Sequence, residues 1–162
     1  MTSIQKAHTA DISAIQQLAA PVWKLTYKDI LSEVQIAYML NLFYSTSSLQ
    51  KQMSEGHQFI LAVEDEQRKG FADYAELTPS VYKLHKLYVD ADQQGKGTGK
   101  LLLDYLIQDI LLNKGTQLEV NVNRNNKALH FYQKNGFEII REEDIDIGNG
   151  YFMNDYVLLK KL

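Results

Sequence analysis

The amino-acid sequence predicts an α/β fold in which helices flank a mixed central sheet of about six to seven strands. The chain begins with helical hydrophobic periodicity, continues over residues 58–89 as short apolar strands separated by polar turns, and then alternates strand, helix and strand. The strand–helix–strand order over residues 81–122 implies a parallel crossover. With 162 residues, 45% of them hydrophobic, the chain is expected to form one domain over residues 1–162.

The N-terminal part is expected to contain one strand and one helix. The strand covers residues 3–8, and the helix is capped by Thr9 or Asp11 and runs to about Ala20, with apolar residues at helical spacing. Pro21 is expected to close or bend this helix, because proline cannot donate the backbone hydrogen bond that would continue it.

The other elements follow in order. A second helix begins at Ser32 with a capping-box-like start, and a third covers about residues 47–55 and ends at Gly56. Residues 66–70 are interpreted as a polar turn, and residues 148–150 as the tight reversal of a final hairpin. Hydrophobic periodicity predicts strands over residues 58–64, 71–77, 81–89, 117–122, 137–147 and 151–159, and helices over residues 97–112 and 125–135.

Composition excludes several classes of function. The formal net charge is −3 and there is no basic run, so neither nucleic acid nor a membrane is the expected partner. The absence of cysteine excludes disulfides, thiolate metal sites and an acyl-cysteine intermediate, and the histidines lack metal-ligand spacing, so no metal is expected. No signal peptide or membrane-length apolar run is evident, and a cytoplasmic location is expected.

The most informative segment is a glycine-rich loop between a strand and an apolar helix. Gly95, Gly97 and Gly99 alternate there, and a stretch without Cβ atoms lets successive N–H groups approach a phosphate at a helix N-terminus. Gln94 stands where a P-loop needs its first glycine, and Leu101 stands where it needs Ser or Thr. The glycine spacing also differs from the Gly-x-Gly-x-x-Gly of dinucleotide-binding folds. The loop therefore predicts a phosphorylated cofactor other than ATP or NAD.

Two motifs resemble those of the GCN5-related N-acetyltransferase (GNAT) family. Gln94-x-x-Gly97-x-Gly99 is similar to the family's Gln/Arg-x-x-Gly-x-Gly/Ala motif, which binds the pyrophosphate of acetyl-CoA. The segment from Asn125 to Phe137 is similar to its later Asn-x-x-Ala-x-x-x-Tyr-x-x-x-Gly-Phe motif, in the same order along the chain. The resemblance is best from about Phe59 onward, so it specifies the cofactor better than the acceptor.

The resemblance implies roles for particular residues. Tyr132 corresponds to the tyrosine that protonates the departing thiolate, and its phenol, with a reference pKa of about 10, is protonated at neutral pH. Asn125 corresponds to a cofactor contact. The backbone of the strand end would bind pantetheine and polarise the thioester, and the loop would bind pyrophosphate; these cofactor-binding residues are Leu87, Tyr88, Val89, Gln94, Gly95, Lys96, Gly97, Thr98, Gly99 and Lys100.

Each assignment has a structural alternative. Tyr132 could be a core aromatic residue with a satisfied hydroxyl. Asn125 could be a helix N-cap, with Asn126 a near-equivalent candidate, and the lysines Lys96 and Lys100 could be solvated surface residues.

The resemblance implies direct transfer of the acetyl group of acetyl-CoA to a primary amine of a small molecule, a polyamine among them, or of a protein. A transferase for a longer acyl-CoA and a non-catalytic CoA-binding sensor are the alternatives. Homodimers are common among such domains, although the sequence shows no clear interface.

The general base and the acceptor pocket stay open. Glu76, His85, Glu119 or a water chain could remove the amine proton. The acidic run Glu142, Glu143, Asp144 and Asp146 could attract a cation or simply be solvated. Aromatic residues of the helical N-terminal region could line the acceptor pocket or the core: Trp23, Tyr27, Tyr38 and Tyr44.

Overall fold

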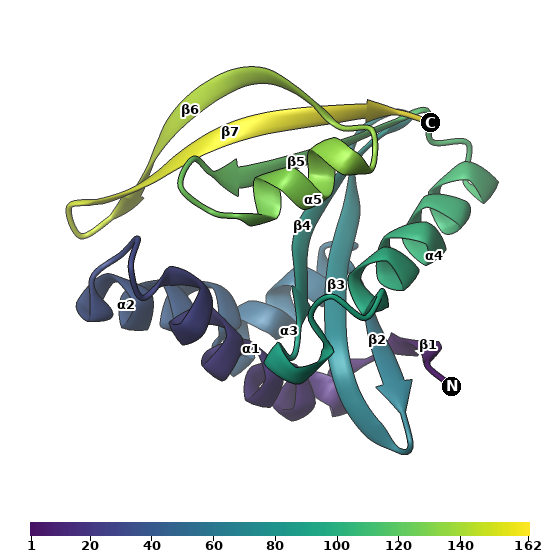
Figure 1. Ribbon diagram of the computed structural model, residues 1–162, viewed down its shortest axis with the longest axis horizontal. Coiled ribbons are helices and arrows are strands. Elements are labelled where there is room, and N and C mark those ends of the chain that lie inside the picture. Colours follow the sequence, from purple (N-terminus) through teal and green to yellow (C-terminus); the bar gives the residue numbers. More distant parts are fainter.

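A computed structural model describes residues 1–162 and confirms the mixed α/β fold (Figure 1). Its sheet has seven strands in the order β1-β2-β3-β4-β5-β7-β6. The strands are β1 Ser3–Ala7, β2 Gln58–Glu64, β3 Gln67–Thr78, β4 Val81–Val89, β5 Gln117–Asn123, β6 Glu138–Gly148 and β7 Tyr151–Lys161. The helices are α1 Ile12–Tyr27, α2 Glu33–Tyr44, α3 Thr46–Ser54, α4 Thr98–Leu112 and α5 Ala128–Lys134, with short 3-10 turns η1 Thr9–Asp11 and η2 Ala91–Gln93.

One pair of strands in the sheet is parallel, as the strand–helix–strand pattern predicts. β4 and β5 run parallel, joined by α4, and every other neighbouring pair is antiparallel. The parallel register extends only from Val81 opposite Gln117 to Leu84 opposite Val120. Beyond these residues the two strands diverge, which opens the sheet at its centre (Figure 1).

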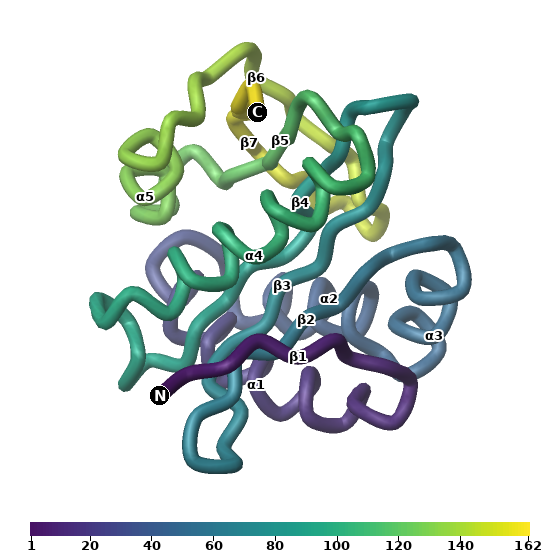
Figure 2. Tube along the Cα trace, turned by 90° about the vertical axis from the view of Figure 1, so that its right-hand side faces the viewer, coloured from purple at the N-terminus to yellow at the C-terminus, as the bar shows by residue number.

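Helices cover both faces of the sheet and bury two apolar clusters. Helices α4 and α5 contribute residues such as Leu106 and Tyr132 to one cluster, which contains Ile60 and Ala62 of β2. Helices α1 to α3 form the other cluster with Phe59 of β2 and neighbouring strands. Figures 1 and 2 both place α5, β6 and β7 above and α1 to α3 below. No helix combines the length and apolar character needed to cross a membrane.

The prediction that Pro21 ends or bends the first helix is wrong about its end, since α1 continues to Tyr27. Pro21 lies on the exposed side of the helix, and Gln17, whose carbonyl loses its partner, is also exposed, so water can satisfy that group. Trp23 and Tyr27 on the opposite side are buried. Their burial outweighs the lost hydrogen bond and extends the helix.

The polar turn expected over residues 66–70 is also shorter than predicted. Strand β3 begins at Gln67, which pairs with Glu64, and the turn consists of Asp65 and Glu66 with φ of 49° and 63°. Positive φ at both central residues fits the tight reversal of an antiparallel hairpin. Polar residues therefore extend β3 past the core, where no apolar pattern marks a strand.

The helix predicted over residues 125–135 covers only α5, Ala128–Lys134. Asn123 Oδ1 accepts a hydrogen bond from the Asn125 backbone N–H at 2.9 Å, and Asn126 Oδ1 accepts one from the Ala128 N–H at 3.0 Å. These side chains stabilise turns that compete with helix. Asn125 is therefore not a helix N-cap.

Candidate active site

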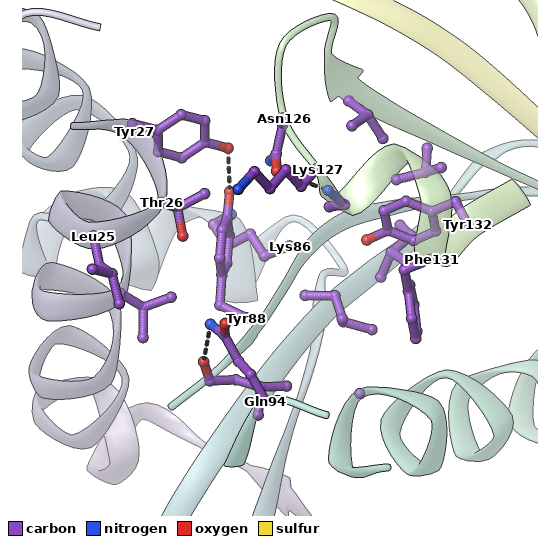
Figure 3. A pocket seen from close by; sticks show the side chains of 18 of the residues that line it. Leu25, Thr26, Tyr27, Lys86, Tyr88, Gln94, Asn126, Lys127, Phe131 and Tyr132 are labelled. Carbon is purple, nitrogen blue, oxygen red and sulfur yellow. Dashed lines mark hydrogen bonds between the residues drawn. The ribbon is translucent and has the colours of Figure 1, made fainter. Parts of the chain in front are cut away.

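A cavity of about 1190 Å³ lies where β4 and β5 diverge. Its walls come from both strands, the glycine-rich loop, α1 and the segment that contains α5 (Figure 3). The sequence-predicted residues that line it are Leu87, Tyr88, Val89, Gln94, Gly95, Gly97, Gly99, Lys100, Asn125 and Tyr132. Lys96 and Thr98 do not line it: Lys96 is exposed, and the Thr98 side chain is buried at the start of α4.

The inner rim of the cavity is the second half of β4. Past Leu84 this strand has no β5 partner, so its backbone N–H and C=O groups on that side are available to a ligand. On the other side, Asp73 pairs with Lys86 and Tyr74 pairs with Leu84, so His85 is the extra residue of a β-bulge. Because a bulge bends its strand, it helps to direct β4 away from β5.

The glycine-rich loop fits a bound pyrophosphate. Gly95 and Gly97 have φ of +79° and +86°, and a Cβ built on either would meet no protein atom within 4 Å. The N–H groups of five residues donate to no protein acceptor: Gly95, Gly97, Thr98, Gly99 and Lys100. Four of them belong to the N-cap and first turn of α4, where the helix dipole favours an anion. Lys100 is held by Asp104, with its Nζ 2.8 Å from Oδ1, so its charge is already partly neutralised.

Tyr132 is buried in the wall of the cavity at 5% exposure. Its ring packs edge-on against Phe131 and Phe137, with centroids 5.2 and 5.4 Å away, which fixes its orientation. Its hydroxyl points into the cavity and makes no hydrogen bond within the protein (Figure 3). Burial raises the pKa of Tyr132, so the phenol keeps its proton at neutral pH.

A pair of tyrosines faces Tyr132 across the cavity (Figure 3). The hydroxyls of Tyr27 and Tyr88 are 3.0 Å apart, and burial raises the pKa of both. Sequence reasoning assigned Tyr88 a role through its backbone alone and did not pair the two rings. The sequence did contain one indication that Tyr27 faces inward. Trp23 and Tyr27 are four residues apart in α1 and therefore share one helix face.

Of the three side chains considered as general base, His85 alone lines the cavity. Desolvation lowers the pKa of His85 to about 4, so its imidazole is neutral at pH 7 and is a weaker base than a free imidazole. Glu119 lies 3.7 Å from Arg141, and Glu76 accepts a hydrogen bond from the Ser80 N–H.

The acidic run near the last hairpin is largely paired within the protein. Arg124 forms ion pairs with Glu142 and Asp144, and Arg141 pairs with Glu143 at 2.7 Å. These carboxylates are therefore poorly placed to attract a cationic substrate.

The aromatic residues of the N-terminal helices divide into two groups. Trp23, Tyr27 and Tyr44 line a smaller cavity beside the first one. Tyr38 lines neither of these cavities, and its hydroxyl donates to the Ile147 carbonyl oxygen at 2.6 Å.

Comparison with known proteins agrees with this geometry. Residues 27–154 match the family described as acetyltransferase (GNAT) domain. The chain is 29% identical over 157 residues to spermidine N(1)-acetyltransferase of Thermoplasma acidophilum, covering 93% of this chain and 94% of the relative. It is 37% identical over 67 residues to the peptidyl-lysine N-acetyltransferase YjaB of Salmonella typhimurium, covering 40% of this chain and 43% of that protein.

A solved structure agrees over the full length. The PaiA N-acetyltransferase of Thermoplasma acidophilum, determined in complex with coenzyme A, superposes with a TM-score of 0.87 at 26% identity, covering 100% of this chain and 99% of that one. The match to the domain family spans most of the chain and confirms the resemblance carried by the two motifs. The chain belongs to the GNAT family of acetyl-CoA-dependent N-acetyltransferases.

Proposed function

We propose that this chain transfers the acetyl group of acetyl-CoA directly to a primary amine of a small molecule or a protein. One observation carries the proposal: a run of unpaired N–H groups at the start of α4 shares a cavity with the inward-pointing hydroxyl of Tyr132. An anion site at one end and a proton donor inside suit a phosphorylated thioester.

The residues of the chain divide the work along the cavity. Acetyl-CoA, when bound, supplies the thioester whose acyl group is transferred. The loop from Gly95 to Lys100 would hold its pyrophosphate, and the backbone of Leu87, Tyr88 and Val89, along the edge of β4 that has no β5 partner, would bind its pantetheine arm and polarise the carbonyl. Asn125 would contribute a further contact from the opposite rim.

Transfer forms a bond from the amine nitrogen to the acyl carbon and breaks the bond from that carbon to sulfur. The amine loses one proton, which a water molecule or the neutral imidazole of His85 would accept. Tyr132 would give its phenolic proton to the departing sulfur and recover one from solvent. No acyl-enzyme forms on this route.

The relatives support two acceptor classes. One is named for spermidine and another for peptidyl-lysine, and both acceptors present a primary amine on an unbranched alkyl chain. Two alternatives to acetyl transfer stay open: the transfer of a longer acyl group from its CoA ester, and the binding of CoA without turnover.

Replacing Tyr132 with phenylalanine tests the proposed general acid. We expect turnover to fall on the order of tenfold to a thousandfold, because only the proton donor is removed from a ring that keeps its packing. Release of free thiol from acetyl-CoA measures turnover, and calorimetry with CoA should give the wild-type affinity. Turnover should be compared between Tyr132→Phe and wild type from about pH 6 to about pH 9, a range on both sides of neutrality. Equal turnover of the two proteins across this range would remove Tyr132 from the mechanism.

Replacing Gly97 with leucine tests the pyrophosphate site. We expect CoA affinity to fall by about a hundredfold or more, because the side chain would occupy the space that the phosphate needs beside the backbone. Gly56→Leu is the matched control, since Gly56 also has positive φ and open space at its Cβ position but lies outside the cavity. Equal CoA affinity in the two folded variants would contradict the assignment.

A further inference from the structure

A second cavity of about 170 Å³ adjoins the first on the sheet face that α1 and α2 cover. Six residues line both cavities, and the tyrosine pair is among them, so it stands between the two: Tyr27, Leu84, His85, Lys86, Tyr88 and Asn121. The walls of the second cavity combine aromatic rings, Trp23 and Tyr44 among them, with polar and charged side chains. It is therefore a side chamber of the transfer site.

Asp155 of β7 lines this chamber and is 6% exposed. Its one hydrogen bond is from Asn121 Nδ2 to Oδ2 at 3.3 Å, which is long and neutral, and it forms no ion pair. A buried carboxylate is costly unless a cation compensates it. Burial accordingly raises the pKa of Asp155 above its ordinary value.

No cation forms an ion pair with Asp155, although the charges of Lys83 and Arg124 favour its ionised form from a longer distance. Lys83 and Lys86 also line the chamber, but Lys86 Nζ is bound to Asp73 at 2.7 Å, and Lys83 forms no ion pair with Asp155. Arg124 is engaged with two carboxylates of β6. Asp155 is therefore a buried anion in a cavity, without a cation of its own.

We propose that Asp155 is the specificity-determining residue of the acceptor site and binds the distal ammonium group of an unbranched diamine or polyamine. This inference rests on the proposed function, because the proximal amine of the same molecule would receive the acetyl group. Asn121 lines both cavities and Asp155 only the second, so the acceptor would enter the chamber past the tyrosine pair.

The size and walls of the chamber match an aminoalkyl chain. A dry cavity of about 150 Å³ holds a molecule of benzene, so this chamber can take roughly six to eight non-hydrogen atoms. The faces of Trp23, Tyr27 and Tyr44 can pack against methylene groups and attract an ammonium group. A lysine side chain has a single amine, which would receive the acetyl group, so it would bring no second cation to Asp155.

Putrescine and n-pentylamine provide a matched pair of probes, since a methyl group in pentylamine replaces one ammonium group of putrescine. For the wild type we expect kcat/KM for putrescine to exceed that for pentylamine at least tenfold. In Asp155→Asn this preference should fall by about tenfold to a hundredfold, mainly through a higher KM for putrescine, as expected when a charged hydrogen bond is lost. In Lys83→Gln it should rise, because a like charge is removed from the chamber.

Asp146→Asn is the control variant, since Asp146 is exposed on the same hairpin and lines neither cavity. An equal loss of preference in Asp146→Asn would show that general charge and not a contact is responsible, and would overturn the inference. The enzyme could acetylate pentylamine or a lysyl peptide while Asp155→Asn leaves the preference for putrescine over pentylamine unchanged. That result would overturn the inference about Asp155 and leave the proposed function intact. Wild-type protein that binds CoA but acetylates none of these amines would overturn the proposed function itself.

Discussion

Two aspartates are buried in this sheet, and their surroundings differ. Asp73 of β3 is 0% exposed and lies 2.8 Å from His57 Nδ1 and 2.7 Å from Lys86 Nζ. Asp155 of β7 is 6% exposed and has only the amide of Asn121. The pKa of Asp73 is lowered by its hydrogen bond to His57 and by the charge of Lys86 despite the desolvation that opposes it, whereas burial raises the pKa of Asp155. A buried carboxylate that the fold has paired with an ammonium group is compensated, and removing one partner is costly; a carboxylate left without a cation is suited to receive one from outside.

The match at Asp73 comes from strand register. Lys86 is directly opposite Asp73 on the neighbouring strand, and its ammonium also donates to Gln52 Oε1 at 2.6 Å. The rings of Tyr44 and Phe59 lie 5.6 and 5.4 Å from the same nitrogen. Asp73 and Lys86 therefore tie β3 to β4 beside the bulge at the cavity rim.

The largest expected effect is on folding stability. Asp73→Asn should lower the free energy of unfolding by about 3–5 kcal/mol, because it leaves the buried ammonium of Lys86 without its anion. Urea unfolding followed by circular dichroism measures this loss. Adding Lys86→Met should restore part of the stability, and a double variant less stable than Asp73→Asn would contradict this account.

The pH dependence of stability should separate the two sites next. Because the folded-state pKa of Asp73 lies below its ordinary value of 3.8, its contribution to stability is complete above about pH 5 and is lost as pH falls through the folded-state value. The stability difference between wild type and Asp73→Asn should therefore be constant from about pH 5 to about pH 7, where the carboxyl is ionised in both the folded and the unfolded state. Below about pH 5 the difference should shrink. A difference that grows on acidification would refute the assignment.

Asp155→Asn should change the free energy of unfolding least, and it should raise it where Asp73→Asn lowers it. The raised folded-state pKa means that stability falls as pH rises from about 3.8 through that value, and the variant removes this loss. We expect a gain of up to about 1 kcal/mol at neutral pH, limited by the favourable charges of Lys83 and Arg124 and increased by the unfavourable charge of Glu143. A large loss of stability would place Asp155 with Asp73 as a structural residue.

The sequence predicted the fold well where local chemistry decides it, and most of the residues it singled out line one cavity. Residues 58–64 and 81–89 form strands with the predicted bounds, because apolar residues dominate both segments. Gly97 caps α4, and Tyr132 faces the cavity, as their motifs indicate. These features depend on short-range spacing, which is visible in a chain read on its own.

Features that depend on distant partners could not be predicted. Whether Pro21 ends α1 depends on what Trp23 and Tyr27 pack against. The pairing of Asp73 with Lys86 depends on register across a hairpin that contains a bulge. Asp155 did carry a signal, a single carboxylate within an apolar strand of the last hairpin, but the exposed acidic run before it was the more conspicuous feature.

The short parallel ladder between β4 and β5 is a seam, a narrow connection between the two halves of the sheet. Four residue pairs join a half-sheet of β1 to β4 to a half-sheet of β5 to β7. Any molecule bound in the opening contacts both half-sheets and therefore stabilises their arrangement. We therefore expect amide hydrogens along this seam to exchange with deuterium more slowly once CoA is added, so that occupancy can be followed without any turnover.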